Sequence, residues 1–204
     1  MDSRTDHLKL WQKFYSVFTL HIELMGIDPP IWRNLVVDGD TSLGKLHHYL
    51  QAAMGWTDSH LHAFQVGDQL YGDLKSDKDG TLKLLDERKV ILKRYFEEGS
   101  TFIYQYDFGD NWQHRITVED IVNHADEPIG VAYVKTGERA CPPEDVGGTA
   151  EYERFVECIQ EDRNSDESRQ LLDWAGPDFN PEQFDRHATN AALLRMAWNH
   201  WGGK

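Results

Sequence analysis

Apolar and polar residues alternate along the first two thirds of the chain, and this alternation predicts β-strands. In residues 14–25 the even-numbered positions are mostly apolar, and a period of two places them on one face of a strand. Residues 26–30 interrupt the pattern before a β-branched and aromatic run at 31–37, which indicates an antiparallel pair. The same alternation predicts three further strands, at 60–66, 101–107 and 112–118.

A longer spacing predicts helices. Leu43, Leu46 and Leu50 recur at the spacing of one helix face. Ser42 offers an N-cap oxygen before this helix, and Gly55 suits the left-handed conformation that ends a helix. Three later segments show helical spacing as well, at 149–162, 166–175 and 181–198.

The order of these elements predicts the fold class. Strands dominate residues 14–134, and helices dominate the last third of the chain. This order indicates an α+β fold, with a mainly antiparallel sheet in residues 14–134 packed by one early helix and by a helical C-terminal third. We expect a single domain at 14–198 after an N-terminal extension at 1–13. A separate helical C-terminal domain is the alternative.

Charge restricts the classes of partner. The chain has 204 residues and a formal net charge of −14. Proteins that bind a phosphate backbone need a basic surface, so this charge argues against direct nucleic-acid binding. Residues 1–12 lack the apolar core of a signal peptide, and no apolar run is long enough to cross a membrane. We therefore expect a cytoplasmic protein without a membrane partner, in which Cys141 and Cys158 are reduced thiols.

The aromatic content is high for a globular protein. Aromatic residues make up 12% of the chain and include seven tryptophans. Core packing on the predicted strands and helices accounts for most of them. Trp32, Trp56 and Trp112 remain, each close in sequence to Arg, His or Asp, and we expect them to border one possible site.

Several strings of residues are distinctive in order and composition: DPPIWR (28–33), AMGW (53–56), HLHAF (60–64), YDFGDNWQH (106–114), GERACPPEDVGG (137–148), DFNP (178–181) and FD (184–185). Together they resemble the plasmid pRiA4b ORF-three-like (MM3350-like) family over about residues 15–195. The resemblance implies an α+β fold and a plasmid association but no activity; some relatives are labelled resolvases or are joined to DNA-binding segments. The chain departs from the family pattern at Asn111, Val146 and Asn180, where Gly, Cys and Asp are usual.

Three histidines are candidate metal ligands: His60, His62 and His114. The first two share one face of a predicted strand, and the third lies on another predicted strand. Imidazole nitrogens with a nearby carboxylate, such as Asp107 or Asp110, can bind a divalent metal such as Zn or Mn. The spacing is not diagnostic. Hydrogen bonding at the edge of an aromatic core and metal-free acid–base chemistry are the alternatives.

Six residues are candidates for ligand binding: Arg33, Trp56, Asp107, Asp110, Trp112 and Arg139. An arginine beside a tryptophan can stack on the ring or bind a carboxylate. Structural roles are the alternative, because arginines pair with acidic residues and aspartates in turns bond their own backbone. The loop at 141–148 is expected to be a rigid lead into a helix, and Cys141 could act as a nucleophile only beside a base.

These observations support three functional hypotheses. The first is a binding or interaction module, with an aromatic-lined pocket for a protein, peptide or small molecule. The predicted rim of that pocket is His60, His62, Asp107, Asp110 and Arg139. The second is a divalent-metal-dependent hydrolase that uses the His/Asp set. The third is an accessory protein of a mobile DNA element, which depends on the family resemblance alone.

Overall fold

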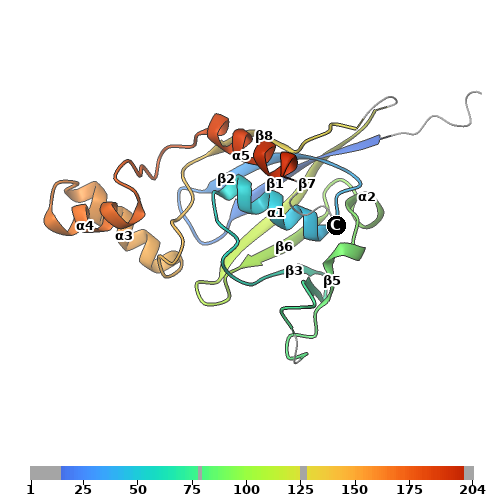
Figure 1. The fold of residues 1–204 in the computed structure, drawn as a ribbon, viewed down its shortest axis with the longest axis horizontal. Helices are drawn as coiled ribbons and strands as arrows, with labels where there is room; N and C mark the ends of the chain where they lie inside the picture. The colour runs from blue at the N-terminus through green and yellow to red at the C-terminus, as the bar shows by residue number, and fades with distance from the viewer. Residues whose placement is uncertain (1–14, 78–79, 125–127, 200–204) are drawn as a thin grey trace, which may run out of the picture.

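The centre of the molecule is a twisted sheet. A computed structural model describes residues 15–77, 80–124 and 128–199. The eight strands have the order β5-β4-β3-β6-β7-β1-β2-β8 (Figure 1). They are β1 (Tyr15–Leu24), β2 (Ile31–Asp38), β3 (His62–Val66), β4 (Gln69–Gly72), β5 (Leu85–Asp86), β6 (Thr101–Tyr106), β7 (Trp112–His124) and β8 (Tyr133–Glu138). Neighbouring strands are antiparallel except β4 and β5, which are parallel.

The helices complete an α+β fold, as predicted. They are α1 (Leu43–Met54), the short 3-10 helix η2 (Glu87–Lys89), α2 (Leu92–Tyr95), α3 (Thr149–Glu161), α4 (Asp166–Ala175) and α5 (Arg186–Trp198). The predicted caps of α1 are confirmed: the Ser42 side chain accepts the Lys45 N–H, and Gly55 has a φ of 88°. The predicted N-terminal extension at 1–13 lies outside the described residues.

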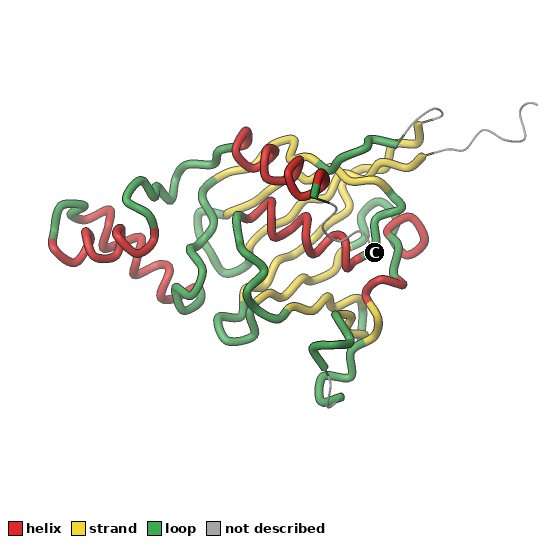
Figure 2. The backbone as a smooth tube through the Cα atoms, in the orientation of Figure 1, coloured by secondary structure: helices red, strands yellow, loops and turns green. Residues whose placement is uncertain are grey.

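One face of the sheet is apolar and packs against helices. Along β1, Phe18, Leu20 and Ile22 are buried on this face, which α1 and α5 both cross (Figure 2). The opposite face carries half-buried and exposed polar residues such as His21 and Arg115. An antiparallel sheet with one solvated face has this alternation, so the pattern in the sequence follows from the burial of one side only.

Two elements begin later than the sequence pattern predicts. The third strand starts at His62 rather than at residue 60, because its partner β6 ends at Tyr106, which pairs with His62, and the next residue, Asp107, has a φ of 52°. Helix α5 starts at Arg186 rather than at residue 181, because the Asp185 carboxylate accepts the N–H groups of the first helical turn.

The C-terminal helices separate into two groups. Helices α3 and α4 pack on each other beyond one end of the sheet, whereas α5 returns to the face that carries α1 (Figure 2). Asn190 on α5 holds the edge strand β8: its side chain accepts the Val134 N–H at 2.7 Å and donates to the Val134 oxygen at 3.0 Å. This contact positions α5 beside α1. None of the described helices combines the length and the apolar character needed to cross a membrane.

Candidate functional site

The loop between α1 and β3, residues 55–61, carries polar groups toward two clusters and a pocket. Trp56 anchors the loop: its Nε1–H donates to the Pro142 oxygen at 3.0 Å, and its ring stacks on Tyr106 with 4.8 Å between centroids. The Trp112 ring lies 6.2 Å from that of Trp56, and Trp112 is only 1% exposed. Both predicted ligand-binding tryptophans thus belong to the core, but Trp56, unlike Trp112, also borders a pocket.

Polar side chains, most of them titratable, gather in two groups around this loop. We call the first group the inner cluster, and it consists of His47, Gln51, Asp58, His62, Glu87 and Tyr104. We call the second group the outer cluster, and it consists of His60, Asp107, Glu144 and Asp145. In each cluster, three of the side chains offer one possible metal-ligating atom each, and these three atoms lie within 4.8 Å of one another. They belong to His47, Asp58 and His62 in the inner cluster and to His60, Asp107 and Asp145 in the outer cluster.

The inner cluster contains a closed ring of hydrogen bonds. Asp58 donates its backbone N–H to Gln51 Oε1 at 2.8 Å, and Gln51 Nε2 donates to the Tyr104 hydroxyl at 2.9 Å. The Tyr104 proton is then free to go to His47 Nδ1, which lies 2.8 Å away. His47 in turn carries its proton on Nε2 and donates it to Asp58 Oδ1 at 2.7 Å. One arrangement of protons therefore satisfies all four residues.

The protonation states follow from burial. Burial lowers the pKa of His47 to about 4, although the hydrogen bond to Asp58 opposes this shift. Burial would raise the pKa of Asp58, but hydrogen bonds from His47 and His48 outweigh it and hold that pKa below its usual range. Burial raises the pKa of Tyr104 well above its ordinary value. At neutral pH the cluster thus contains a neutral His47 and an ionised Asp58.

His62 extends the inner cluster toward Glu87. Its ring stacks on the ring of His47, with 3.5 Å between centroids and an angle of 6° between planes. Its Nε2 lies 2.8 Å from Glu87 Oε2, and Glu87 is itself buried. The second oxygen of Asp58 lies 3.4 Å from His48 Nδ1. Most of the atoms that a metal would need are therefore already engaged within the chain.

The outer cluster is more open. His60 Nε2 lies 3.0 Å from Asp145 Oδ1 and 3.8 Å from Glu144 Oε2. His60 Nδ1 lies 3.6 Å from Asp107 Oδ2. The Nε2 atom is shielded from solvent, yet it has no hydrogen-bond partner among the described residues. Three carboxylates thus surround one imidazole with little internal hydrogen bonding.

Two of these carboxylates are fixed by their neighbours. Asp107 has a φ of 52°, and its Oδ1 accepts the Gly109 N–H at 2.9 Å, as in an Asx turn. Glu144 Oε1 accepts the Thr57 N–H at 2.8 Å and the Tyr106 hydroxyl at 3.1 Å. Asp107 Oδ2 and Glu144 Oε2 therefore remain directed at His60.

The structure does not bring the three predicted metal histidines together. His60 lies in the outer cluster and His62 in the inner one, because the first precedes β3 and the second begins it. Among the described residues, His114 belongs to neither cluster. It is fully buried, and its Nδ1 lies 3.2 Å from the Tyr104 main-chain oxygen. Burial lowers the pKa of His114 to about 4. Its ring packs edge-on against Trp56, so His114 belongs to the aromatic core.

Arg33, predicted to bind ligand, is 2% exposed and occupied by the chain itself. Its five N–H groups have acceptors in the main-chain oxygens of Ala53, Trp32, Glu138 and Arg139 and in Cys141 Sγ. The Phe184 ring lies 3.9 Å from its guanidinium carbon. These contacts join β2, α1 and the segment after β8, and they leave no donor for a ligand.

Arg139 and Asp110 also make contacts within the chain. Arg139 donates to the Pro29 oxygen and to Glu182 Oε1, the latter at 3.0 Å, beside a second pocket of about 440 Å³. Asp110 Oδ2 accepts the Gly147 N–H at 2.9 Å and so ties the β6–β7 turn to the loop before α3. Neither residue lines the pocket that Trp56 borders.

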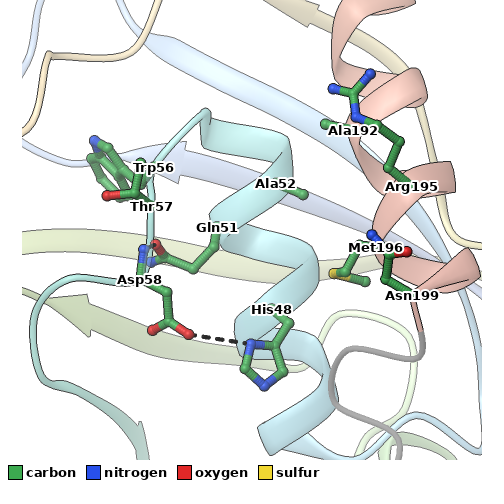
Figure 3. A pocket seen from close by; sticks show the side chains of 10 residues that line it. All are labelled: His48, Gln51, Ala52, Trp56, Thr57, Asp58, Ala192, Arg195, Met196 and Asn199. Atoms are coloured by element: carbon green, nitrogen blue, oxygen red, sulfur yellow. Dashed lines mark hydrogen bonds and ion pairs between the residues drawn. The ribbon is translucent and has the colours of Figure 1, made fainter.

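That pocket lies between α1, α5 and the loop after α1, and it has a volume of about 250 Å³ (Figure 3). Its lining consists of His48, Gln51, Ala52, Trp56, Thr57, Asp58, Ala192, Arg195, Met196 and Asn199. Asp58 and His48 lie close together on one side, and Arg195 extends from α5 on the other (Figure 3). Arg195 makes no ion pair within the described part of the chain.

Sequence reasoning missed most of this pocket. The residues from α5 were not identifiable because nothing local in the sequence places α5 beside α1. His47 did carry a signal. It lies four residues after Leu43 and three before Leu50, so it falls on the apolar face of the predicted helix. A histidine at such a position needs buried hydrogen-bond partners, which the inner cluster supplies.

Comparison with known proteins identifies the family. A family model described as plasmid pRiA4b ORF-3-like protein matches residues 16–188. The chain belongs to this family. The uncharacterized protein y4hQ of Sinorhizobium fredii (strain NBRC 101917 / NGR234) is 34% identical over 184 residues, which are 89% of this chain and 90% of that protein. The crystal structure of the protein of unknown function MM3350 from Methanosarcina mazei Go1 has a TM-score of 0.75 and 34% identity, over 85% of this chain and 97% of that one.

The strings on which the resemblance to the pRiA4b ORF-3-like family depends meet at the outer cluster. His60 comes from the string at 60–64, Asp107 from the string at 106–114, and Glu144 and Asp145 from the string at 137–148. Three segments that are far apart in the sequence therefore contribute to one small group of side chains.

Proposed function

We propose that this protein is a binding module for a small ligand, and that the pocket between α1 and α5 holds it. One observation carries this proposal: Trp56, Asp58 and Arg195 line the same pocket and give it an aromatic side chain, an ionised carboxylate and a guanidinium that has no ion pair among the described residues. Ligand pockets characteristically combine apolar walls with a few converging polar groups. This pocket lies elsewhere than the predicted rim, and its lining includes Trp56, His48 and Asp58.

The lining favours a small amphoteric ligand with an apolar body. The Asp58 carboxylate accepts from His47 and contacts His48, and a carboxylate has about four acceptor positions, so it can also accept from a ligand ammonium group. Arg195 can bind a ligand carboxylate. Trp56, with neighbouring alanines and a methionine, suits an apolar ring. A volume of about 250 Å³ is below that of pockets for drug-sized molecules, so we expect a ligand of amino-acid size.

Three matched compounds test this chemistry. The full chain, labelled with ¹⁵N, would be titrated with L-phenylalanine, with phenethylamine, which lacks the carboxylate, and with 3-phenylpropionate, which lacks the amine. We expect the zwitterion to bind at least about tenfold more tightly than either relative, because one lost charged hydrogen bond costs about 1.5–3 kcal/mol. The Trp56 indole N–H resonance should shift on binding.

Two variants that replace an alanine of α5 by leucine test whether binding takes place in this pocket. Ala192→Leu fills the pocket, whereas Ala191→Leu makes the same change at the neighbouring exposed position of α5. We expect the first to abolish binding and the second to preserve it. The proposal is wrong if none of the three compounds shifts a pocket resonance, or if the two variants bind equally well.

The other sequence-based hypotheses stay predictions. The hydrolase requires a bound metal and room for a substrate beside it, and the mobile-element role depends on family resemblance. A cytoplasmic location and a protein partner are likewise predictions. A small-ligand pocket neither requires nor excludes any of these four predictions.

A further inference from the structure

The outer cluster joins three loops that are remote in sequence. His60 comes from the loop before β3, Asp107 from the β6–β7 turn, and Glu144 and Asp145 from the loop before α3. One ring nitrogen of His60 and one oxygen each of Asp107 and Asp145 lie within 4.8 Å of one another. Ligand atoms around a tetrahedral zinc ion, each about 2.0–2.2 Å from the metal, lie about 3.4 Å from one another, so side-chain rotations would have to draw this set closer around an ion.

The cluster has an excess of acceptors over donors. Three carboxylates face a single imidazole, and like charges at such short range repel one another. His60 Nε2 is shielded from solvent without a hydrogen-bond partner in the described chain, although Asp145 Oδ1 is 3.0 Å away. A buried nitrogen without a hydrogen bond is costly, and coordination to a cation would satisfy it and offset the repulsion together.

We propose that the outer cluster binds one divalent transition-metal ion, Zn²⁺ or Mn²⁺, through a ring nitrogen of His60 and a carboxylate oxygen of each of Asp107 and Asp145. Glu144 adds a third negative charge 3.8 Å from His60 Nε2. The mixed nitrogen and oxygen set suits Zn²⁺ and Mn²⁺ better than Ca²⁺ or Mg²⁺, which prefer oxygen alone. This site is separate from the small-ligand pocket and does not depend on it.

The inner cluster offers similar residues, but most of their ligating atoms are already hydrogen-bonded. Both nitrogens of His47 are hydrogen-bonded, to Tyr104 and to Asp58, and His62 Nε2 is engaged with Glu87. A metal there would have to break the closed ring, whereas a metal in the outer cluster breaks no hydrogen bond of His60. The geometry therefore assigns the ion to the outer cluster.

Calorimetric titration of the metal-free full chain tests the assignment. The titrants are ZnCl₂, MnCl₂, MgCl₂ and CaCl₂, each alone, and the variants are His60→Gln and Asp145→Asn. Asp145 is 70% exposed at its side chain, so its variant should fold normally. His21→Gln is the matched control, because His21 is 28% exposed, close to the 29% of His60, and also lies near two carboxylates, Glu23 and Glu119.

We expect one ion per chain, with Zn²⁺ bound more tightly than Mn²⁺ and both more tightly than Mg²⁺ or Ca²⁺. Either outer-cluster variant should weaken Zn²⁺ binding by about tenfold or more, whereas the control should change it less than about twofold. The assignment is overturned if neither Zn²⁺ nor Mn²⁺ binds, if both variants bind Zn²⁺ like the unmodified chain, or if the control loses the site.

Discussion

The inner and outer clusters contain the same kinds of residue, and they differ in how their polar atoms are satisfied. In the inner cluster, Tyr104 and Gln51 supply the neutral donors and acceptors that close a ring around His47 and Asp58. In the outer cluster, the neutral hydroxyls of Tyr106 and Thr57 bond Glu144 rather than His60. Neutral partners thus decide whether a His/Asp group is a structural network or an open site.

Burial separates the clusters as well. His47 and Tyr104 are almost fully buried, so any change to their hydrogen bonds leaves polar groups without water. The side chains of His60 and Asp145 are 29% and 70% exposed, so solvent can replace a lost partner of Asp145, although His60 Nε2 itself is shielded. We therefore expect perturbations of the inner cluster to change stability and perturbations of the outer cluster to change mainly the binding of ions.

The largest expected effect is on the pH dependence of stability. The pKa values of His47 and His114 are both lowered from 6.5 to about 4, so the unfolded chain binds protons more readily than the folded one between those values. Stability is therefore complete above pH 6.5 and falls as the pH decreases toward 4. The loss should be on the order of 3 kcal/mol for each histidine, measured by urea unfolding at a series of pH values.

His114→Gln separates the two contributions. This variant lacks one buried imidazole, so the decrease in its unfolding free energy between pH 7 and pH 4.5 should be roughly half as large. His21→Gln, on the open face of the sheet, should leave the decrease unchanged. Equal pH profiles for the His114 variant and the unmodified chain would contradict the assigned pKa shift.

A smaller effect is expected from removing one hydroxyl at matched positions on β6. Tyr104→Phe leaves His47 Nδ1 and Gln51 Nε2 without their partner, and both residues are buried, so it should cost about 2 kcal/mol. Tyr106→Phe removes the partner of Ser59 and Glu144, which reach solvent and can bond water instead. Its cost should be below about 1 kcal/mol.

Urea unfolding at pH 7 measures both tyrosine variants under one condition. A similar loss of unfolding free energy in the two variants would show that burial of the partners is not what distinguishes the clusters. A larger loss for Tyr106→Phe would reverse their order of importance.

The sequence predicts those parts of the fold that depend on local patterns. Alternation along β1 and the spacing of Leu43, Leu46 and Leu50 both arise because one face of the element is buried. A periodic pattern shows which face is buried but not which element packs against it. The cap at Ser42 and the stop at Gly55 are equally local. These features are confirmed because nearby residues alone determine them.

The sites depend on contacts between distant segments, and the sequence pattern contains no such information. Period two puts His60 and His62 on one face, but β3 begins only at His62, so His60 lies in the preceding loop and joins a different cluster. The placement of α5 against α1 depends on Asn190 and β8, so Arg195 could not be connected with Trp56 in advance. The family strings contain all four members of the outer cluster, but nothing in them separates His60 and Asp107 from the other candidate residues or marks Glu144 and Asp145 as their partners.

The smallest expected effect concerns Asp145→Asn without added metal. Removing one of three clustered carboxylates relieves repulsion, so the unfolding free energy at pH 8 should rise, by less than about 0.5 kcal/mol because the side chain is exposed. Salt screens such interactions, so the gain should be present in 20 mM NaCl and disappear in 500 mM NaCl. With saturating Zn²⁺ the unmodified chain should instead have the larger unfolding free energy, because only the unmodified chain gains the full stabilisation from metal binding. A decrease in stability at low salt, in the absence of metal, would mean that Asp145 is a structural partner of His60 and that the outer cluster is closed in the same way as the inner one.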